Sequence, residues 1–154
     1  FVDTKATGNW FDMVIVKSLS KGHIVYPGNP DLPHAWAYLP DLARAAAELA
    51  ERRETLPAYA DIAFPGFTLS GQAIAESLSR STGRPIRVKR MSWWPMHVVG
   101  IVWKTGRALV EMRYLWDTPH SLDSTRFARL LPDFQATGID AALAKASAPA
   151  TKAG

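Results

Sequence analysis

The sequence predicts an α/β fold in which short strands alternate with a majority of helices. Three observations lead to it: the β-rich runs are short, segments with apolar residues at helical spacing follow them, and Gly, Pro and Asn mark the turns between them. With 154 residues, 47% of them hydrophobic, the chain can bury a core as one domain. We expect one unit over residues 1–146 and a flexible, low-complexity tail over residues 147–154.

The first elements are predicted from apolar spacing and turn residues. Residues 10–19 repeat apolar side chains at helical spacing, and Gly22 is expected to end this helix. Residues 23–26 and 35–39 are β-rich and flank the turn PGNPDLP, so each is predicted to be a strand.

The next segment, PDLARAAAEL, predicts a helix from Asp41 to about Arg53. The Asp41 carboxylate can accept the free backbone N–H groups of the first turn, and is expected to be the helix cap. The apolar face is predicted to consist of Leu42, Ala43, Ala46, Leu49 and Ala50.

The second half of the chain continues the alternation. We predict a buried strand over residues 59–64, and then a helix that is capped by Thr68 or Ser70, runs through Ser81 and is ended by Gly83. A β-rich run follows over residues 86–88. The region over 96–116 is predicted to be irregularly helical, with weak points at Gly100 and Gly106, and helices over 124–131 and 139–146 complete the chain.

Charge and composition exclude several classes of protein. The net charge is +4, but the basic residues are scattered, which favours a solvated surface over nucleic-acid binding. The absence of cysteine excludes disulfides and thiolate chemistry. The longest apolar run, residues 93–103, is about half a membrane span. We therefore expect a soluble, cytoplasmic protein without a membrane partner; the alternative is that residues 93–116 form an amphipathic helix at a membrane surface or partner.

A search for motifs mostly finds absences. No Gly-x-Gly-x-x-Gly follows a strand, and no phosphate-binding loop ends in Lys-Ser/Thr. The four histidines lack the i, i+4 pairing around a glutamate that is typical of zinc enzymes, so no metal site is expected. Because the chain begins at Phe1 in a turn-rich stretch, we expect it to be part of a longer polypeptide.

Aromatic residues with polar neighbours are the best candidates for a binding site. They occur as Asn9-Trp10-Phe11, as His34-Ala-Trp36-Ala-Tyr38 and around Arg113 and Trp116. Most tryptophans in proteins belong to the core, and that is the alternative interpretation here. In the functional interpretation the rings form the wall of a pocket, and an adjacent Asn, His or Arg binds a polar group of the ligand.

Strand alternation assigns the residues of the second strand to two faces. His34, Trp36 and Tyr38 share one face, whereas Ala35, Ala37 and Leu39 take the other. The small face suits packing against a sheet or helix, so we expect the aromatic face to line a cleft. Arg113, between a helical segment and an aromatic pair, would suit a carboxylate clamp or a surface arginine bonded to helix carbonyls.

Three segments together resemble the C-terminal half of the extended and atypical short-chain dehydrogenase/reductase superfamily, the NAD(P)-dependent epimerase/dehydratase-like proteins. AYLPDLARA resembles that family's strand-to-helix corner, with Pro40-Asp41 in place of Asp-Asp. FTLSG resembles its strand end followed by a capped helix. DSTR…LPDF with Thr137 resembles its closing segment. The match depends on the order and spacing of these segments.

The resemblance implies that this chain is the C-terminal, substrate-binding portion of a Rossmann-type short-chain dehydrogenase. In such proteins an N-terminal Rossmann half binds NAD or NADP and carries a catalytic Tyr-x-x-x-Lys pair. No tyrosine here has a lysine four residues later. The expectation is that the catalytic residues lie on that N-terminal half, its partner, and that this chain alone binds no cofactor and does not catalyse.

Particular residues take roles by the same resemblance. Val2 and Thr4 fall where the family's backbone lies near the nicotinamide, although Val2-Asp3-Thr4 departs from its Gly-Pro pattern. Asn9 and Arg113 fall near substrate-binding residues of relatives. The arginine that often precedes the corner is replaced by Pro33-His34, which favours a small carbonyl or alcohol substrate over a nucleotide sugar.

The predicted substrate-binding residues are thus Asn9, Trp10, Phe11, His34, Trp36, Tyr38, Arg113 and Trp116. Two functions from different classes remain: the substrate-binding part of an NAD(P)-dependent oxidoreductase or epimerase, or a non-catalytic NAD(P)-sensing regulator or interaction module. An apolar surface left exposed without the Rossmann half would favour a homodimer.

Overall fold

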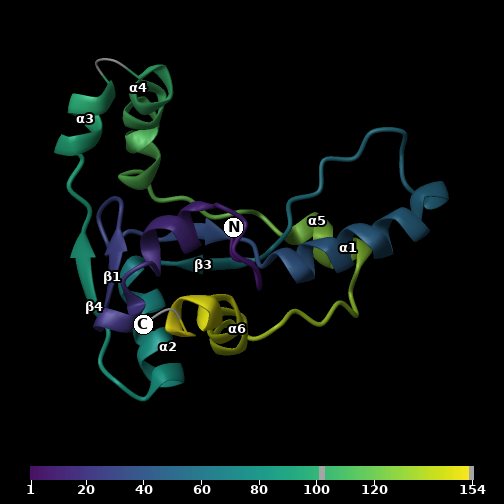
Figure 1. The fold of residues 1–154 in the computed structure, drawn as a ribbon. Coiled ribbons are helices and arrows are strands. Elements are labelled where there is room, and N and C mark those ends of the chain that lie inside the picture. The colour runs from purple at the N-terminus through teal and green to yellow at the C-terminus, as the bar shows by residue number, and fades with distance from the viewer. Residues whose placement is uncertain (101–102, 153–154) are drawn as a thin grey trace.

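The computed structural model describes residues 1–100 and 103–152 and is a mixed α/β arrangement (Figure 1). Most elements are helices, and the strands are short. In chain order the elements are a π-helical turn η1 (Phe11–Ile15), η2 (Leu19–Lys21), β1 (His23–Tyr26), β2 (His34–Trp36), α1 (Leu39–Glu51), η3 (Arg53–Thr55), β3 (Phe67–Leu69), α2 (Gly71–Thr82), β4 (Arg87–Arg90), α3 (Trp94–Gly100), α4 (Lys104–Glu111), η4 (Met112–Trp116), α5 (Thr125–Leu130) and α6 (Ile139–Lys152).

The strands pair in two separate sheets. β1 and β4 are parallel, with His23 opposite Arg87, and β2 and β3 are antiparallel, with His34 opposite Leu69. Beyond β2 the chain makes one more contact of strand type, a parallel bridge between Tyr38 and Val2. The strand predicted over 35–39 is therefore shorter than expected, because Leu39 already belongs to α1.

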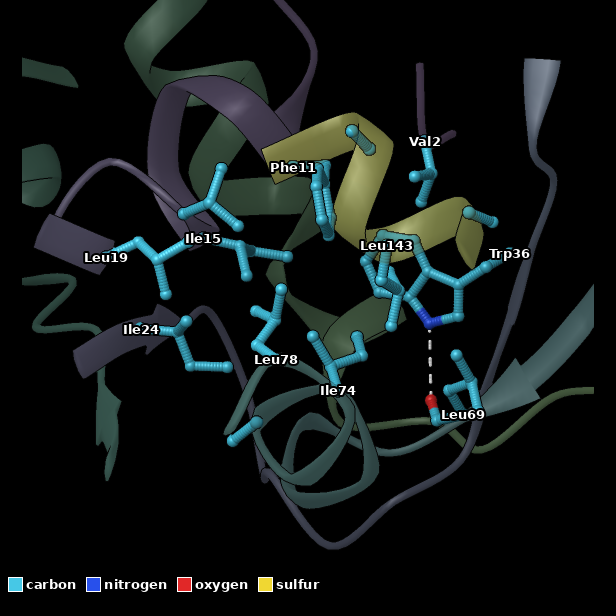
Figure 2. Packing of buried hydrophobic residues seen from close by; sticks show 14 of the residues in the cluster. Val2, Phe11, Ile15, Leu19, Ile24, Trp36, Leu69, Ile74, Leu78 and Leu143 are labelled. Atoms are coloured by element: carbon cyan, nitrogen blue, oxygen red, sulfur yellow. Dashed lines mark hydrogen bonds between the residues drawn. The ribbon is translucent and has the colours of Figure 1, made fainter. Parts of the chain in front are cut away.

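The main core lies between η1, β1, β2, α2 and α6 (Figure 2). Its apolar side chains come from both halves of the sequence, and burying each large one stabilises the fold by about 1.5–3 kcal/mol. Trp36 is anchored by its indole N–H, which donates to the Leu69 carbonyl over 3.2 Å. The labelled members in Figure 2 are Val2, Phe11, Ile15, Leu19, Ile24, Trp36, Leu69, Ile74, Leu78 and Leu143.

A second apolar cluster joins α1 to α5. Phe64, Phe127 and Phe134 meet edge to face, with ring centroids 5.3–6.3 Å apart. Ala45 is the buried contribution of α1 to this cluster. The predicted strand over residues 59–64 was wrong, since these residues form no strand and Tyr59 is 83% exposed. Phe64 instead packs through its side chain.

Local signals for the ends of helices were read correctly at α2. The Ser70 hydroxyl accepts from the Ala73 backbone N–H, and Gly83 ends the helix with a φ of +67°. The single helix predicted over residues 10–19 is instead two short turns, η1 and η2. Gly22 ends η2 in the same left-handed conformation, with a φ of +75°. Glycine is favoured at both positions because it has no Cβ to oppose that conformation.

Asp41 is not the helix cap that we expected. α1 begins two residues earlier, at Leu39, and Pro40 occupies the first turn, where a missing N–H costs nothing. The buried Asp41 carboxylate instead accepts the backbone N–H of Thr137 over 2.6 Å and the Thr137 hydroxyl over 2.9 Å. Arg44 donates to it over 3.0 Å. Asp41 thus joins α1 to the segment before α6.

The buried face of α1 also differs from the prediction. Asp41 and Ala45 are buried and Leu42 and Leu49 are half-buried, whereas Ala43, Ala46 and Ala50 are exposed. A different side of α1 is buried from the one predicted, because two contacts decide which residues face inward. Thr137 bonds Asp41, and the phenylalanine cluster packs on Ala45.

The irregular helical region predicted over 96–116 is a pair of helices followed by η4. α3 ends at Gly100, as the weak point predicted, whereas Gly106 lies inside α4 and packs closely against Gly100. Residues 101–102 of this region lie outside the described residues. In Figure 1 the α3–α4 pair stands away from the strands.

The last helix continues past its predicted end. α6 runs to Lys152 rather than ending at Ala146, and Ser147, expected in the flexible tail, is buried. Near its start, Asp140 accepts from Ser77 over 2.6 Å and from Arg80 over 2.7 Å. These bonds tie α6 to α2. Among the residues described, no helix combines the length and apolarity needed to cross a bilayer.

Replacing Asp41 should test how much the α1–Thr137 contact contributes. Asp41→Ala leaves the Thr137 donors without their acceptor, so we expect the free energy of unfolding to fall by about 2–3 kcal/mol. Urea unfolding followed by circular dichroism measures it. The exposed Asp31→Ala is the control and should change stability little. Equal stability of the two variants would contradict this account.

Candidate functional site

Trp116, at the end of η4, is the centre of an aromatic cluster formed by four segments of the chain. Its ring centroid lies 5.6 Å from that of Trp10, 5.7 Å from Tyr26 and 6.1 Å from Trp36. These rings come from the start of η1, the end of β1 and the end of β2. The cluster therefore assembles at the point where both strands end.

A cavity of about 270 Å³ opens beside this cluster. Its walls are apolar and aromatic, and its few polar side chains are two histidines and an asparagine. That composition is typical of a site for a small organic molecule. The lining residues are Phe1, Asn9, Trp10, His34, Ala35, Trp36, Met112, Leu115, Trp116 and His120.

Gly28 allows the Trp116 backbone to approach the PGNPDLP turn closely. A Cβ at this position would lie 2.1 Å from the Trp116 carbonyl oxygen and 2.6 Å from its carbon, which no side chain can do. Gly71 has a similar role behind Tyr26, where a Cβ would meet the ring at 2.8 Å. The PGNPDLP turn and the start of α2 thus set the depth at which the aromatic rings lie.

His34 is the most buried polar group at the cavity, with 2% of its surface exposed. Its Nδ1 lies 2.7 Å from the Tyr26 hydroxyl, a pairing of β2 with β1. Its Nε2 is buried and makes no hydrogen bond of full geometry among the described residues. The ring of His120 lies against it, 5.2 Å between centroids, because the His120 backbone N–H donates to the Pro33 carbonyl over 3.1 Å.

Both partners of the Tyr26–His34 pair are held neutral. Burial raises the pKa of Tyr26 above its ordinary value. Burial, and then the neighbouring His120, lower the pKa of His34, against smaller opposing effects of the Trp116 backbone, which acts as a hydrogen-bond acceptor, and of the Asp117 charge. At pH 7 the site therefore presents a phenol and an uncharged imidazole.

The structure brings five of the eight predicted substrate-binding residues to the cavity: Asn9, Trp10, His34, Trp36 and Trp116. The amide of Asn9 is already engaged, since its Oδ1 accepts the Phe11 backbone N–H over 2.8 Å and its Nδ2 donates to the Thr7 hydroxyl over 2.8 Å. Asn9 thus forms part of the wall while it orders the start of η1.

The other three lie elsewhere. Phe11 is in the core behind Trp36, with ring centroids 6.3 Å apart. Tyr38 is buried beside Val2. Arg113 is exposed and points to Asp117, with 3.7 Å between Nε and Oδ2, so it does not line the cavity.

The expected division of the second strand, with the small face packed and the aromatic face lining a cleft, is only partly found, since His34 and Trp36 line the cavity but Tyr38 does not. His34, Trp36 and Tyr38 do share a face, but this face is the buried one, and Ala35 is only half-buried. The large rings remove more apolar area from water than alanines can, so they take the core side. His34 and Trp36 reach the cavity from within the core.

The two residues placed near a cofactor by resemblance have structural contacts. Val2 is buried, and its backbone exchanges hydrogen bonds of 2.8 Å with Ala37 and Leu39. The Thr4 backbone N–H donates to the Asp3 carboxylate over 2.7 Å. In the described part of the chain, no three His, Asp or Glu side chains gather as a metal site would require.

Sequence reasoning missed five lining residues: Phe1, Ala35, Met112, Leu115 and His120. Met112 and Leu115 could have been suggested by the proximity of Trp116 in η4. His120 had no such signal, because a backbone bond to Pro33 brings it to the site across 87 residues. No family model, curated protein or solved structure matches this chain.

The lowered pKa of His34 predicts how stability changes with pH. Below about pH 6.5 the unfolded chain binds a proton at this histidine that the folded chain resists, so the free energy of unfolding should fall as the pH drops from 7.5 to 5.5. Urea unfolding at the two pH values measures the loss. In His34→Phe the loss should be smaller, whereas the exposed His97→Phe should retain it. An identical loss in all three proteins would exclude His34 as its source.

Proposed function

We propose that this chain is the substrate-binding part of an NAD(P)-dependent oxidoreductase or epimerase, and that the cavity beside Trp116 holds a small carbonyl or alcohol substrate. The observation that carries the proposal is the cavity itself. Its tryptophan walls can exclude water from a small organic molecule, and a neutral histidine can orient the oxygen of that molecule.

A contact between two of the resembling segments supports the same proposal. Asp41 belongs to the strand-to-helix corner, and Thr137 belongs to the closing segment. They lie 96 residues apart in sequence and are joined by two hydrogen bonds. A chance resemblance would not require these segments to meet.

The proposal assigns binding to this chain and chemistry to an N-terminal Rossmann half. That half would bind NAD or NADP, which supplies or accepts the hydride when bound. Within this chain the task is to position the substrate: Trp116 and Trp10 restrict its orientation, and His34 lies deepest. Tyr26 cannot act as a base near neutral pH, since burial raises its pKa.

Turnover by the full-length protein tests this division of labour. We expect NADH or NADPH binding, and oxidation of the bound cofactor by small ketones such as 1-indanone, followed at 340 nm. Trp116→Leu removes a wall of the cavity and should raise KM about tenfold, because an indole contributes a large apolar contact. The control is Trp94→Leu, an exposed tryptophan outside the cavity, which should leave KM unchanged.

Two outcomes would contradict the proposal. A full-length protein that binds neither dinucleotide cannot be an NAD(P)-dependent enzyme. Equal KM values in the two tryptophan variants would mean that the substrate binds elsewhere.

A second candidate is the non-catalytic NAD(P)-sensing or interaction module, favoured by the surface of α3, α4 and η4. Trp94 is 73% exposed and Tyr114 64% exposed, and Trp103 and Leu115 are also exposed. Exposed aromatic residues gathered on one projecting part are typical of an association surface.

This surface predicts self-association of the chain. Size-exclusion chromatography with light scattering should give a dimer that Trp94→Ser with Trp103→Ser converts to monomer, because the substitutions remove the apolar contact. Tyr59→Ser, an exposed aromatic residue in the segment between η3 and β3, is the matched control. A wild-type monomer at high concentration would contradict the homodimer.

A further inference from the structure

We propose that the cavity selects neutral ligands carrying a hydrogen-bond acceptor, such as a ketone oxygen, and that the Nε2–H group of His34 donates to that oxygen. Tyr26 is the positioning residue, because it determines which ring nitrogen of His34 carries the proton. This inference rests on the proposed function, since it names the ligand chemistry of the same cavity.

The Tyr26 hydroxyl sets the tautomer. Its only hydrogen-bond partner within the described ranges is His34 Nδ1, 2.7 Å away, and the tyrosine is fully buried. A buried hydroxyl hydrogen needs an acceptor, and Nδ1 can be that acceptor only when it carries no proton. The neutral imidazole then carries its hydrogen on Nε2.

This arrangement leaves a buried donor without a well-formed hydrogen bond. Within residues 1–100 and 103–152 no acceptor meets full hydrogen-bond geometry with Nε2, although more than nine-tenths of His34 is buried and the Trp116 backbone acts on the ring as an acceptor that raises its pKa. Buried donors are usually paired, so an unpaired one at the wall of a cavity indicates the place of a ligand oxygen. Nε2 itself has almost no exposed surface, so the proposal requires a neighbouring side chain to move when the ligand binds. The His120 ring, which lies against His34 and is exposed, is the candidate for that movement.

The rest of the lining determines which ligands are favoured. None of the lining side chains is Lys, Arg, Asp or Glu, so a charged ligand would find no oppositely charged side chain in the lining. The amide of Asn9 and the indole N–H of Trp36 are bonded within the protein. His34 is therefore the deepest polar group still able to bind a ligand. The volume of about 270 Å³ suits one small ring system.

A matched pair of probes isolates the hydrogen bond. 1-Indanone and indane have nearly the same shape, but only the ketone has an acceptor oxygen. Titrations of this chain, followed by the indole ¹H–¹⁵N signals of Trp10 and Trp116, should give binding of 1-indanone about tenfold tighter than that of indane. A long-range ¹H–¹⁵N spectrum should show His34 protonated on Nε2.

Variants then separate His34 from the walls. His34→Phe should bring the two affinities together while indane still binds, and Tyr26→Phe should reduce the preference and mix the two His34 tautomers. The exposed His97→Phe is the matched control and should keep the full preference.

Different results would contradict the inference alone or the proposed function as well. If both probes bind the wild type equally, or if His34 carries its proton on Nδ1, the inference is overturned while the cavity remains a binding site. If neither probe shifts the tryptophan signals, the cavity is not a site for small neutral molecules, and the proposed function fails with the inference.

Discussion

The arrangement of the site depends on the contact between Gly28 and the backbone of Trp116. Because a Cβ at Gly28 would lie 2.1 Å from the Trp116 carbonyl oxygen, the segment after η4 can settle over β1 and β2 only where the turn has no side chain. Trp116 then contacts Trp10, Tyr26 and Trp36 at once. One close backbone approach thus brings three distant segments together.

The buried polar groups follow two different rules in this protein. Asp41 is buried and fully used, since three hydrogen bonds from Thr137 and Arg44 reach its carboxylate. His34 is buried and only partly used, since Tyr26 bonds one nitrogen and the other makes no hydrogen bond of full geometry in the described part of the chain. The first pattern holds elements together, whereas the second leaves a donor available at a cavity.

The sequence predicted local structure better than it predicted the site. The Ser70 cap, the Gly22 and Gly83 stops and the strands at β1 and β4 depend on a few adjacent residues, and these predictions were confirmed. The role of Asp41 and the strand over residues 59–64 were wrong, because each depends on partners distant in sequence.

The residues of the site also divide into those predicted from nearby sequence and those placed by distant contacts. Trp10, His34, Trp36 and Trp116 were predicted from aromatic residues with polar neighbours, and they do line one cavity. Tertiary packing decides which side of β2 is buried and brings His120 to the cavity. The periodicity of the sequence cannot predict either of these contacts. The mixed α/β class was confirmed by the alternation of short strands and helices.

The α3–α4 pair affects the shape of the cavity, because it is joined to the rest of the protein on both sides. At one end the Trp93 indole donates to the Pro27 carbonyl over 2.6 Å, and at the other end η4 carries Met112 and Leu115 into the cavity wall. A tilt of the pair about the first attachment would move the second and so reshape the wall. The position of the α3–α4 pair is therefore part of what determines the shape of the cavity, although the pair itself lies outside it.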